Sequence, residues 1–449
     1  MDRRKFISST GVAAGALLVN SAAAMPSGTK SAKSKKRKLA LVGTGIRGVT
    51  MFGKDLVRDY GEYMDLVGLC DTNPGRLKFA DGYIGAGCPT FTDLEKLIKQ
   101  TKPEVLIVTT EDRYHHEVII KGMEMGCDII TEKPLTIDEE KAQAILDAEK
   151  RTGRNIIVTF NYRYPPYRAK MKELLMSGLV GDINTVDFHW NIHHSHLMYY
   201  MQRWHGEKDR GGSLWVHKST HHFDMVNWFL NSEPQQVFAY GSLDRFGKKG
   251  SFRGENCRNC AFTSQCPYYW DINKNEFLKA LYADNEHHDG YIRDNCVFRE
   301  NIDIYEKHTA VVKYMNGTLL NYSLTGDTDY DGYWIAFNGT KGRLEARIEG
   351  YPGKSFAEMT FTPIDRYTKE KPTIYRTEYA RGGHWGGDPL MMDKLFKDPS
   401  MPDPLHQQAS LRDGVMSVLT GIAARKSIET GAPVDIKGLT SLVPRLTII

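Results

Sequence analysis

Short apolar runs and helical periodicities alternate along the first third of the chain. An apolar run at 39–42 leads into glycine-rich positions, and further apolar runs at 66–70 and 105–110 alternate with segments of helical pattern. This alternation is typical of a parallel, doubly wound β-sheet covered by helices. We therefore predict an α/β Rossmann domain over residues 39–162.

The pattern changes after about residue 165. Strand-like alternation becomes longer, for example at 185–193 and 318–325, and few helical segments intervene. Such alternation favours an open, largely antiparallel sheet with one face on a core. We predict an α+β C-terminal domain over residues 163–449, with a large open, mainly antiparallel sheet and a late helix at about 411–429.

The first apolar run ends in a G-x-G-x-x-G fingerprint that starts at Gly43. Its glycines allow a tight turn, a close approach of the backbone to a pyrophosphate and close packing of the next helix. The second apolar run ends in Asp71, whose carboxylate can accept hydrogen bonds from ribose hydroxyls, which favours NAD. Ligands of such sheets bind at the carboxyl ends of the strands, which adds Thr110 and Glu132. The predicted dinucleotide site comprises Gly43, Gly45, Ile46, Arg47, Gly48, Asp71, Thr110, Glu132 and Lys133.

The start of the chain has the pattern of an export signal rather than of a folded domain. A twin-arginine pair at 3–4 is followed by an apolar run at 11–19 and by three alanines that resemble a cleavage site. We interpret residues 1–24 as a Tat-type signal peptide and 25–38 as a basic linker, which predicts a periplasmic protein. The apolar run is shorter than the roughly 20 residues that span a bilayer, so we expect no stable membrane anchor.

The basic charge of the chain belongs to this leader. Residues 1–38 hold nine Lys or Arg and one Asp, a formal charge of +8, so the rest of a chain with net charge +4 carries −4. Without a basic patch in the body, nucleic-acid binding has little support. We expect a small-molecule partner instead.

Four of the seven cysteines lie in one inserted region, residues 251–299, that has few apolar residues with which to form its own core. A C-x-x-C pair is a common metal knuckle, and four thiolates complete a tetrahedral zinc site. In an oxidising compartment, disulfides between these cysteines are the alternative to zinc, and free thiols are a third alternative. Structural zinc is the favoured alternative, with the ligands Cys257, Cys260, Cys266 and Cys296.

Three further motifs accompany the dinucleotide fingerprint. They are Glu132-Lys133-Pro134, Asn161-Tyr162-Arg163-Tyr164, and a Gly211-Gly212 pair that leads to His221-His222-Phe223-Asp224. Together with the fingerprint they resemble the Gfo/Idh/MocA oxidoreductases over nearly all of the chain after the linker. The resemblance implies the same two-domain fold and an activity on sugars or related polyols.

The resemblance also assigns roles to residues. It implies that Lys133 lies beside the nicotinamide and the sugar, where it orients the hydroxyl, and that His221 accepts the proton. The chain departs from the family pattern at His217, where the family has Asp, and we include His217 among the catalytic candidates. A buried lysine near a nicotinamide can stabilise alkoxide charge, and a histidine titrates near neutrality. The substrate-binding candidates are Arg163, Tyr164, Lys218, His222 and His384.

These features predict an NAD(H)-dependent oxidoreductase that acts on a secondary hydroxyl of a sugar or glycoside. Free nicotinamide cofactor is scarce outside the cytoplasm, so we expect NAD to be tightly bound, and we expect a homo-oligomer. A redox-assisted glycosidase of the family-109 type is the alternative, although Lys133 favours a dehydrogenase. A non-catalytic sugar-binding protein on the same fold is the second alternative, because a fold does not fix a function.

Overall fold

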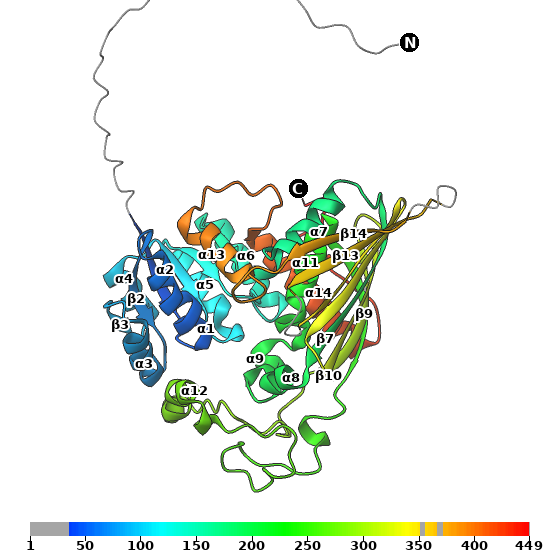
Figure 1. The fold of residues 1–449 in the computed structure, drawn as a ribbon. Coiled ribbons are helices and arrows are strands. Elements are labelled where there is room, and N and C mark those ends of the chain that lie inside the picture. The colour runs from blue at the N-terminus through cyan, green and yellow to red at the C-terminus, as the bar shows by residue number, and fades with distance from the viewer. Residues whose placement is uncertain (1–35, 351–354, 366–370, 449) are drawn as a thin grey trace, which may run out of the picture. The chain divides into compact units, whose positions relative to one another are not determined.

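The computed structural model describes residues 36–350, 355–365 and 371–448, whose strands form two β-sheets (Figure 1). The first sheet has seven strands in the order β15-β6-β5-β4-β1-β2-β3. Its strands pair in parallel, except that β15 runs antiparallel to β6. The strands are β1 (Arg37–Val42), β2 (Met64–Cys70), β3 (Thr90–Phe91), β4 (Val105–Val108), β5 (Asp128–Thr131), β6 (Ile156–Val158) and β15 (Ala409–Ser410).

Helices connect these strands in the right order for a Rossmann fold. Three of them begin at an Asn or Asp whose side chain accepts a hydrogen bond from an amide of the first turn: α3 at Asn73, α4 at Asp93 and α6 at Asp138. Such caps satisfy backbone donors that have no partner within the helix. The helices are α1 (Ile46–Val49), continued by a π-helical turn (Thr50–Asp55) and α2 (Leu56–Tyr60), then α3 (Pro74–Ile84), α4 (Leu94–Thr101), α5 (His115–Glu124) and α6 (Glu139–Thr152).

The second sheet has nine strands in the order β14-β13-β12-β11-β7-β10-β9-β8-β16. Its pairs are antiparallel except for β7 with β10. The two sheets confirm the predicted fold class. The strands are β7 (Ile183–His193), β8 (Pro234–Ser242), β9 (Lys307–Tyr314), β10 (Leu319–Thr328), β11 (Gly332–Gly339), β12 (Gly342–Glu349), β13 (Phe356–Pro363), β14 (Thr373–Glu378) and β16 (Val434–Asp435).

Two long helices pack together beside this sheet, and the sequence indicated only one of them. The late helix α14 (Leu411–Thr430) begins with a capping box at Ser410 and ends at Gly431, whose left-handed conformation suits glycine. Its partner α11 (Ser219–Leu230) is buried along its whole length, so it has no polar face from which a helical period can be read. The remaining helices are α7 (Pro166–Met176), α8 (His194–Met201), α9 (Lys208–Gly211), α10 (Leu214–His217), α12 (Glu276–Leu281) and α13 (Gly387–Met392).

One hydrophobic cluster runs from the first sheet to the second. It includes Leu106 and Ile129 of the first sheet, Trp190 and Phe337 of the second, and Val418 of α14. No helix in the described part of the chain is both long and apolar enough to cross a membrane. The signal peptide and most of the linker lie outside the described residues, and the domain limits remain predictions.

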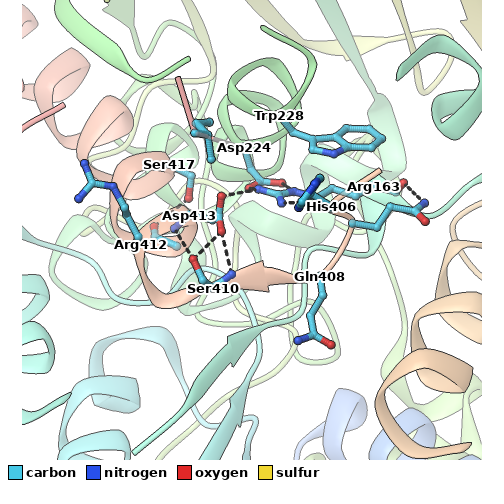
Figure 2. A network of polar contacts seen from close by, with 12 residues as sticks. Arg163, Asp224, Trp228, His406, Gln408, Ser410, Arg412, Asp413 and Ser417 are labelled. Atoms are coloured by element: carbon cyan, nitrogen blue, oxygen red, sulfur yellow. Dashed lines mark hydrogen bonds and ion pairs between the residues drawn. The ribbon is translucent and has the colours of Figure 1, made fainter. Parts of the chain in front are cut away.

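A buried ion network links the end of the first sheet to α11 and α14 (Figure 2). Arg163 donates from Nε and Nη2 to the two carboxylate oxygens of Asp224, at 2.9 and 2.6 Å, and from Nη2 to Asp413 at 3.0 Å. Its Nη1 donates to the backbone oxygen of His406 at 3.1 Å. Burial raises the pKa of Asp224 to about 7 even though Arg163 favours the charged form. Arg163 therefore stabilises the fold by connecting the segment after β6 to α11 and α14.

We expect Arg163→Met to destabilise the protein strongly, because it leaves Asp224 buried without its counter-charge. Breaking one side of a buried ion pair costs about 3–5 kcal/mol. The free energy of unfolding from urea titration measures the loss. Arg376→Met is the matched control, because Arg376 pairs with Glu358 on the exposed strands β13 and β14 and such a pair contributes about 0–1 kcal/mol. Equal losses in the two variants would contradict the structural role of Arg163.

Candidate active site

The glycine loop after β1 has no room for side chains at two of its three glycines. Gly43 has φ +98°, and a Cβ atom there would lie 2.6 Å from the backbone carbon of Thr109. A Cβ atom at Gly48 would lie 2.1 Å from the backbone oxygen of Gly43, so Gly48 lets the helix pack on the turn. At Gly45 the added atom would meet only the Tyr282 hydroxyl, at 3.3 Å, inside a large cavity. The loop therefore presents bare backbone to this cavity.

The cavity has a volume of about 1150 Å³ and is lined by residues of both sheets' domains. This volume exceeds that of typical ligand pockets, about 300–1,000 Å³, and gives room for a dinucleotide and a second small molecule. Most of the predicted dinucleotide residues line it. These are Gly43, Gly45, Ile46, Arg47, Asp71, Thr110, Glu132 and Lys133.

Asp71 lies at the end of β2 with its carboxylate facing the cavity. It accepts hydrogen bonds from the amide and hydroxyl of Thr44, at 2.7 and 2.9 Å, which fix its position. Arg76, the nearest cation, pairs with Asp71 at 3.4 Å and with Asp289 at 2.5 Å, so two carboxylates balance its charge. A carboxylate here suits ribose hydroxyls and repels a 2′-phosphate, so the residues fit NAD.

The cofactor half of the cavity also contains a partly buried ion pair and a hydroxyl that has no hydrogen-bond partner among the described residues. Arg47 donates from Nε to Glu132 at 2.8 Å and contacts Asp388 at 3.4 Å. The hydroxyl of Thr110 is buried without a hydrogen-bond partner among the described residues, and Thr110 lines the cavity. Buried polar groups are rarely left unpaired, so this hydroxyl fits a bound ligand.

Lys133, His217 and Asp112 form a chain of polar contacts at the inner end of the cavity. Lys133 Nζ lies 3.3 Å from His217 Nε2, and His217 Nδ1 lies 2.6 Å from Asp112 Oδ2. An ionised carboxylate only accepts hydrogen bonds, so we assign the proton of the neutral imidazole to Nδ1 and leave Nε2 as an acceptor. Lys133 comes from the end of β5 and His217 from the end of α10, so these polar contacts connect the two domains.

Burial is the main cause of the pKa shifts of Lys133, His217 and Asp112. It lowers the pKa of Lys133 to about 8, although the nearby carboxylate of Asp112 acts to raise it. Burial, assisted by the charge of Lys133, holds the pKa of His217 well below its usual range, so the imidazole is neutral. Burial also raises the pKa of Asp112. A lysine that titrates near pH 8 is suited to take up and release a proton.

His221, the predicted proton acceptor, lines the cavity, and no carboxylate of the described residues contacts it. Its ring stacks on Tyr162 with centroids 4.1 Å apart, and its buried Nδ1 has no hydrogen-bond partner among the described residues. The carboxylate of Asp112 contacts His217 rather than His221. The sequence analysis did not identify Asp112 as a site residue. The signal was present, because Asp112 follows the carboxyl end of β4, where ligands of parallel sheets bind.

Two of the predicted substrate-binding residues, Lys218 and His384, line the cavity. Lys218 Nζ donates to the Tyr162 hydroxyl at 3.0 Å and lies over the Trp190 ring, 4.8 Å from its centroid. His384 has the uncommon φ of +52° and is held through Nδ1 by Asn161, at 2.9 Å. Aromatic faces beside polar groups suit a sugar, which combines C–H faces with hydroxyls.

The other three substrate-binding candidates lie outside the cavity lining, which corrects the prediction for each. Arg163 is held in the ion network described above. Tyr164 is buried in the hydrophobic cluster of the first domain. His222 is fully buried behind Trp190, with its ring centroid 4.1 Å away, and its Nδ1 lies 2.7 Å from the Tyr322 hydroxyl. Chain position alone did not show that these side chains face the core.

The four cysteines of the insert gather around one very small cavity of about 10 Å³. All four are free thiols in the structure, and burial raises the pKa of the Cys257 thiol to about 11. Among the described residues, no group of three or more metal-binding side chains is placed to hold a metal ion. The prediction of zinc at Cys257, Cys260, Cys266 and Cys296 is therefore not supported.

Two family models match the chain in succession. The model for the N-terminal domain of the Gfo/Idh/MocA group, described as an oxidoreductase family with an NAD-binding Rossmann fold, matches residues 37–160. The model for the C-terminal alpha/beta domain of the same oxidoreductase family matches residues 172–436. Together the two models span both sheets.

Individual proteins are similar to the chain to different extents. The protein YteT of Bacillus subtilis (strain 168) is 33% identical over 436 residues, which cover 90% of this chain and 98% of YteT. An inositol 2-dehydrogenase/D-chiro-inositol 3-dehydrogenase of Lactiplantibacillus plantarum is 25% identical over 218 residues, or 48% of this chain and 58% of that protein. A solved levoglucosan dehydrogenase, in complex with NADH and levoglucosan, has a TM-score of 0.66 at 18% identity and covers 90% of this chain and 100% of its own, which shows a shared fold.

Proposed function

Because the chain belongs to the Gfo/Idh/MocA oxidoreductase family, we propose that it is an NAD(H)-dependent dehydrogenase for a secondary hydroxyl of a sugar or glycoside, with tightly bound cofactor. The observation that carries the proposal is the contact chain Lys133–His217–Asp112 in the same cavity as the glycine loop and Asp71. The names of the inositol and levoglucosan dehydrogenases support a sugar or polyol as the substrate class.

The protein's own residues can hold the substrate hydroxyl and move its proton. NAD bound at the glycine loop would supply the hydride acceptor. Lys133 Nζ donates hydrogen bonds to His217, to Nε2 at 3.3 Å and to the backbone oxygen at 3.4 Å. The third position on the amine is then available to a substrate hydroxyl. Neutral Lys133 accepts the hydroxyl proton, while the neutral imidazole of His217, held by Asp112, accepts a hydrogen bond at Nε2 and keeps Nζ in position.

The same cavity offers surfaces that suit a sugar ring. Trp190 and Tyr162 contribute aromatic atoms to its lining, and Lys218, His384 and His221 supply polar groups around them. Pyranose rings need both kinds of contact, because their C–H groups pack on apolar atoms while the hydroxyls form hydrogen bonds. We assign these five residues to substrate binding.

The function is tested by identifying the released cofactor by mass and then adding a panel of inositols, glucosides and levoglucosan to the purified protein. We expect released NAD(H), and reduction of the bound cofactor by at least one sugar, seen in the absorbance band of reduced nicotinamide. Cleavage of a glycoside with no net reduction would instead support the glycosidase alternative. A bound dinucleotide whose absorbance no sugar changes would support a binding protein.

We expect Lys133→Met to lower kcat by about 10²–10⁴-fold, the usual contribution of a positioned acid or base, while the dinucleotide stays bound. The kcat/KM of oxidation should rise as the pH passes about 8, because Lys133 must lose its proton to act as a base. Asp112→Asn removes the charge that raises the pKa of Lys133, so this inflection should move to lower pH.

Two further variants separate the possible proton routes. Glu124→Gln is the control, because Glu124 pairs with Arg151 on the surface and should leave the pH profile unchanged. His221→Ala leaves the contact chain intact, so the inflection should stay near pH 8. If His221→Ala moves the inflection and Asp112→Asn does not, the proton passes to His221 and the assignment of Lys133 as the base is wrong.

We also propose that the protein is exported to the periplasm. The twin-arginine pair and the apolar run of the leader support this proposal. The full-length protein should fractionate with the periplasm when produced in a Gram-negative bacterium. Arg3→Lys combined with Arg4→Lys should retain it in the cytoplasm, whereas the control Lys5→Arg should not. Periplasmic location of the double variant would contradict this route.

A further inference from the structure

Part of the cysteine-containing insert packs on the dinucleotide-binding domain. We call residues 276–291, which comprise α12 and the chain after it, the docking segment. Phe277 of this segment packs edge-on against Phe79 and Tyr83 of α3, with ring centroids 5.5 and 5.1 Å apart. Leu278 and Leu281 are buried in the hydrophobic cluster of the dinucleotide-binding domain. Figure 1 shows α12 next to α3.

Polar contacts then connect the docking segment to the loops that carry the dinucleotide site. The amide of Ile46, in the glycine fingerprint, donates to the Tyr282 hydroxyl at 2.8 Å. Asn73 Nδ2 donates to the backbone oxygen of Asn285 at 2.9 Å. Arg76, which also contacts Asp71, pairs with Asp289 of the docking segment at 2.5 Å. The segment thus contacts both loops that the sequence assigned to the dinucleotide.

The fit between the two surfaces is close. Asn285 packs so tightly over α3 that a Cβ atom added at Gly75 would lie 2.1 Å from its Oδ1. Tyr282 is 4% exposed, and burial raises the pKa of its hydroxyl to about 12, so the group remains a neutral hydrogen-bonding partner. A loosely attached loop would not show this complementarity, so the segment is a fixed part of the site.

The docking segment also forms a wall of the large cavity. Tyr282, Asp289, Gly290 and Tyr291 line it together with the adjoining residues Gly45 and Asp71. Arg203 lines the cavity between the domains and donates to the Tyr291 hydroxyl at 3.3 Å. A dinucleotide bound at the glycine loop would therefore lie in a cavity to which the docking segment contributes part of the lining.

We propose that the docking segment is the outer half of the dinucleotide site, where Tyr282 and Asp289 position the glycine loop and Arg76 and hold a nicotinamide dinucleotide in place between turnovers. This inference rests on the proposed use of NAD(H). Its contacts with Ile46 and Arg76 fix the loops that would hold the dinucleotide. Pre-organised contacts of this kind slow dissociation.

The test measures the dissociation rate of NADH from the full-length protein by the decay of bound-NADH fluorescence after mixing with excess NAD. Tyr282→Phe removes the hydroxyl from the Ile46 amide, and Asp289→Asn removes the charge opposite Arg76. Each variant should speed dissociation by about 3–10-fold, the effect of one net hydrogen bond, and the double variant should exceed either. Unchanged rates in all three would overturn the proposal.

Two matched controls make the comparison specific. Asp284→Asn alters an exposed carboxylate of the same segment that pairs with Lys279, and Tyr269→Phe alters an exposed tyrosine of the same insert. Neither residue lines the large cavity, so both variants should keep the parent rate. Faster dissociation in the controls as well would mean that any change in the insert loosens the site, and would overturn the specific roles of Tyr282 and Asp289.

A second measurement does not depend on any variant. Amide hydrogen exchange of residues 276–291 should slow when NADH is added, together with exchange in the glycine loop. Protection of the glycine loop without protection of 276–291 would overturn the proposal while leaving NAD use intact. Failure of NADH to bind or protect either region would instead count against the proposed function.

Discussion

The position of the active site depends on the buried pairing of Arg163 with Asp224. Arg163 follows the first sheet, Asp224 lies in α11, and Asp413 in α14 accepts from the same guanidinium (Figure 2). A charge buried without a partner costs several kcal/mol, so these three elements stay together. Because His217 and Lys218 immediately precede α11, the pairing also fixes where the second domain meets Lys133.

Lys133, Asp112 and His217 are buried where the two domains meet, and this burial sets their pKa values. Lys133 is buried at the end of a strand, and the loss of hydration moves its pKa toward neutrality while Asp112 limits the shift. The imidazole of His217 is neutral for the same reason and is oriented by a carboxylate from the other domain. The pKa values of this site thus follow from the same packing that joins the domains.

The insert contributes to the cavity through its docking segment. Its free cysteines surround a separate small space, away from the glycine loop. Tyr282 and Asp289 instead reach the dinucleotide-binding loops, so the insert joins the first domain through apolar packing at Phe277 and through directed polar contacts. A segment poor in apolar residues can remain ordered in this way, because a neighbouring domain supplies the core that the segment lacks.

The sequence by itself determined the two-sheet fold and the dinucleotide loop, because both depend on neighbouring positions. Strand periods, the glycines and the acidic residue after β2 are local requirements of backbone and register. Only the tertiary structure decided which side chains meet. Asp112 and His217 are 105 positions apart, Arg163 and Asp224 are 61 apart, and Ile46 and Tyr282 are 236 apart. Such pairs arise from the packing of whole elements, and α11, which carries Asp224, is buried on every side, so the sequence showed no exposed polar face that would have revealed it.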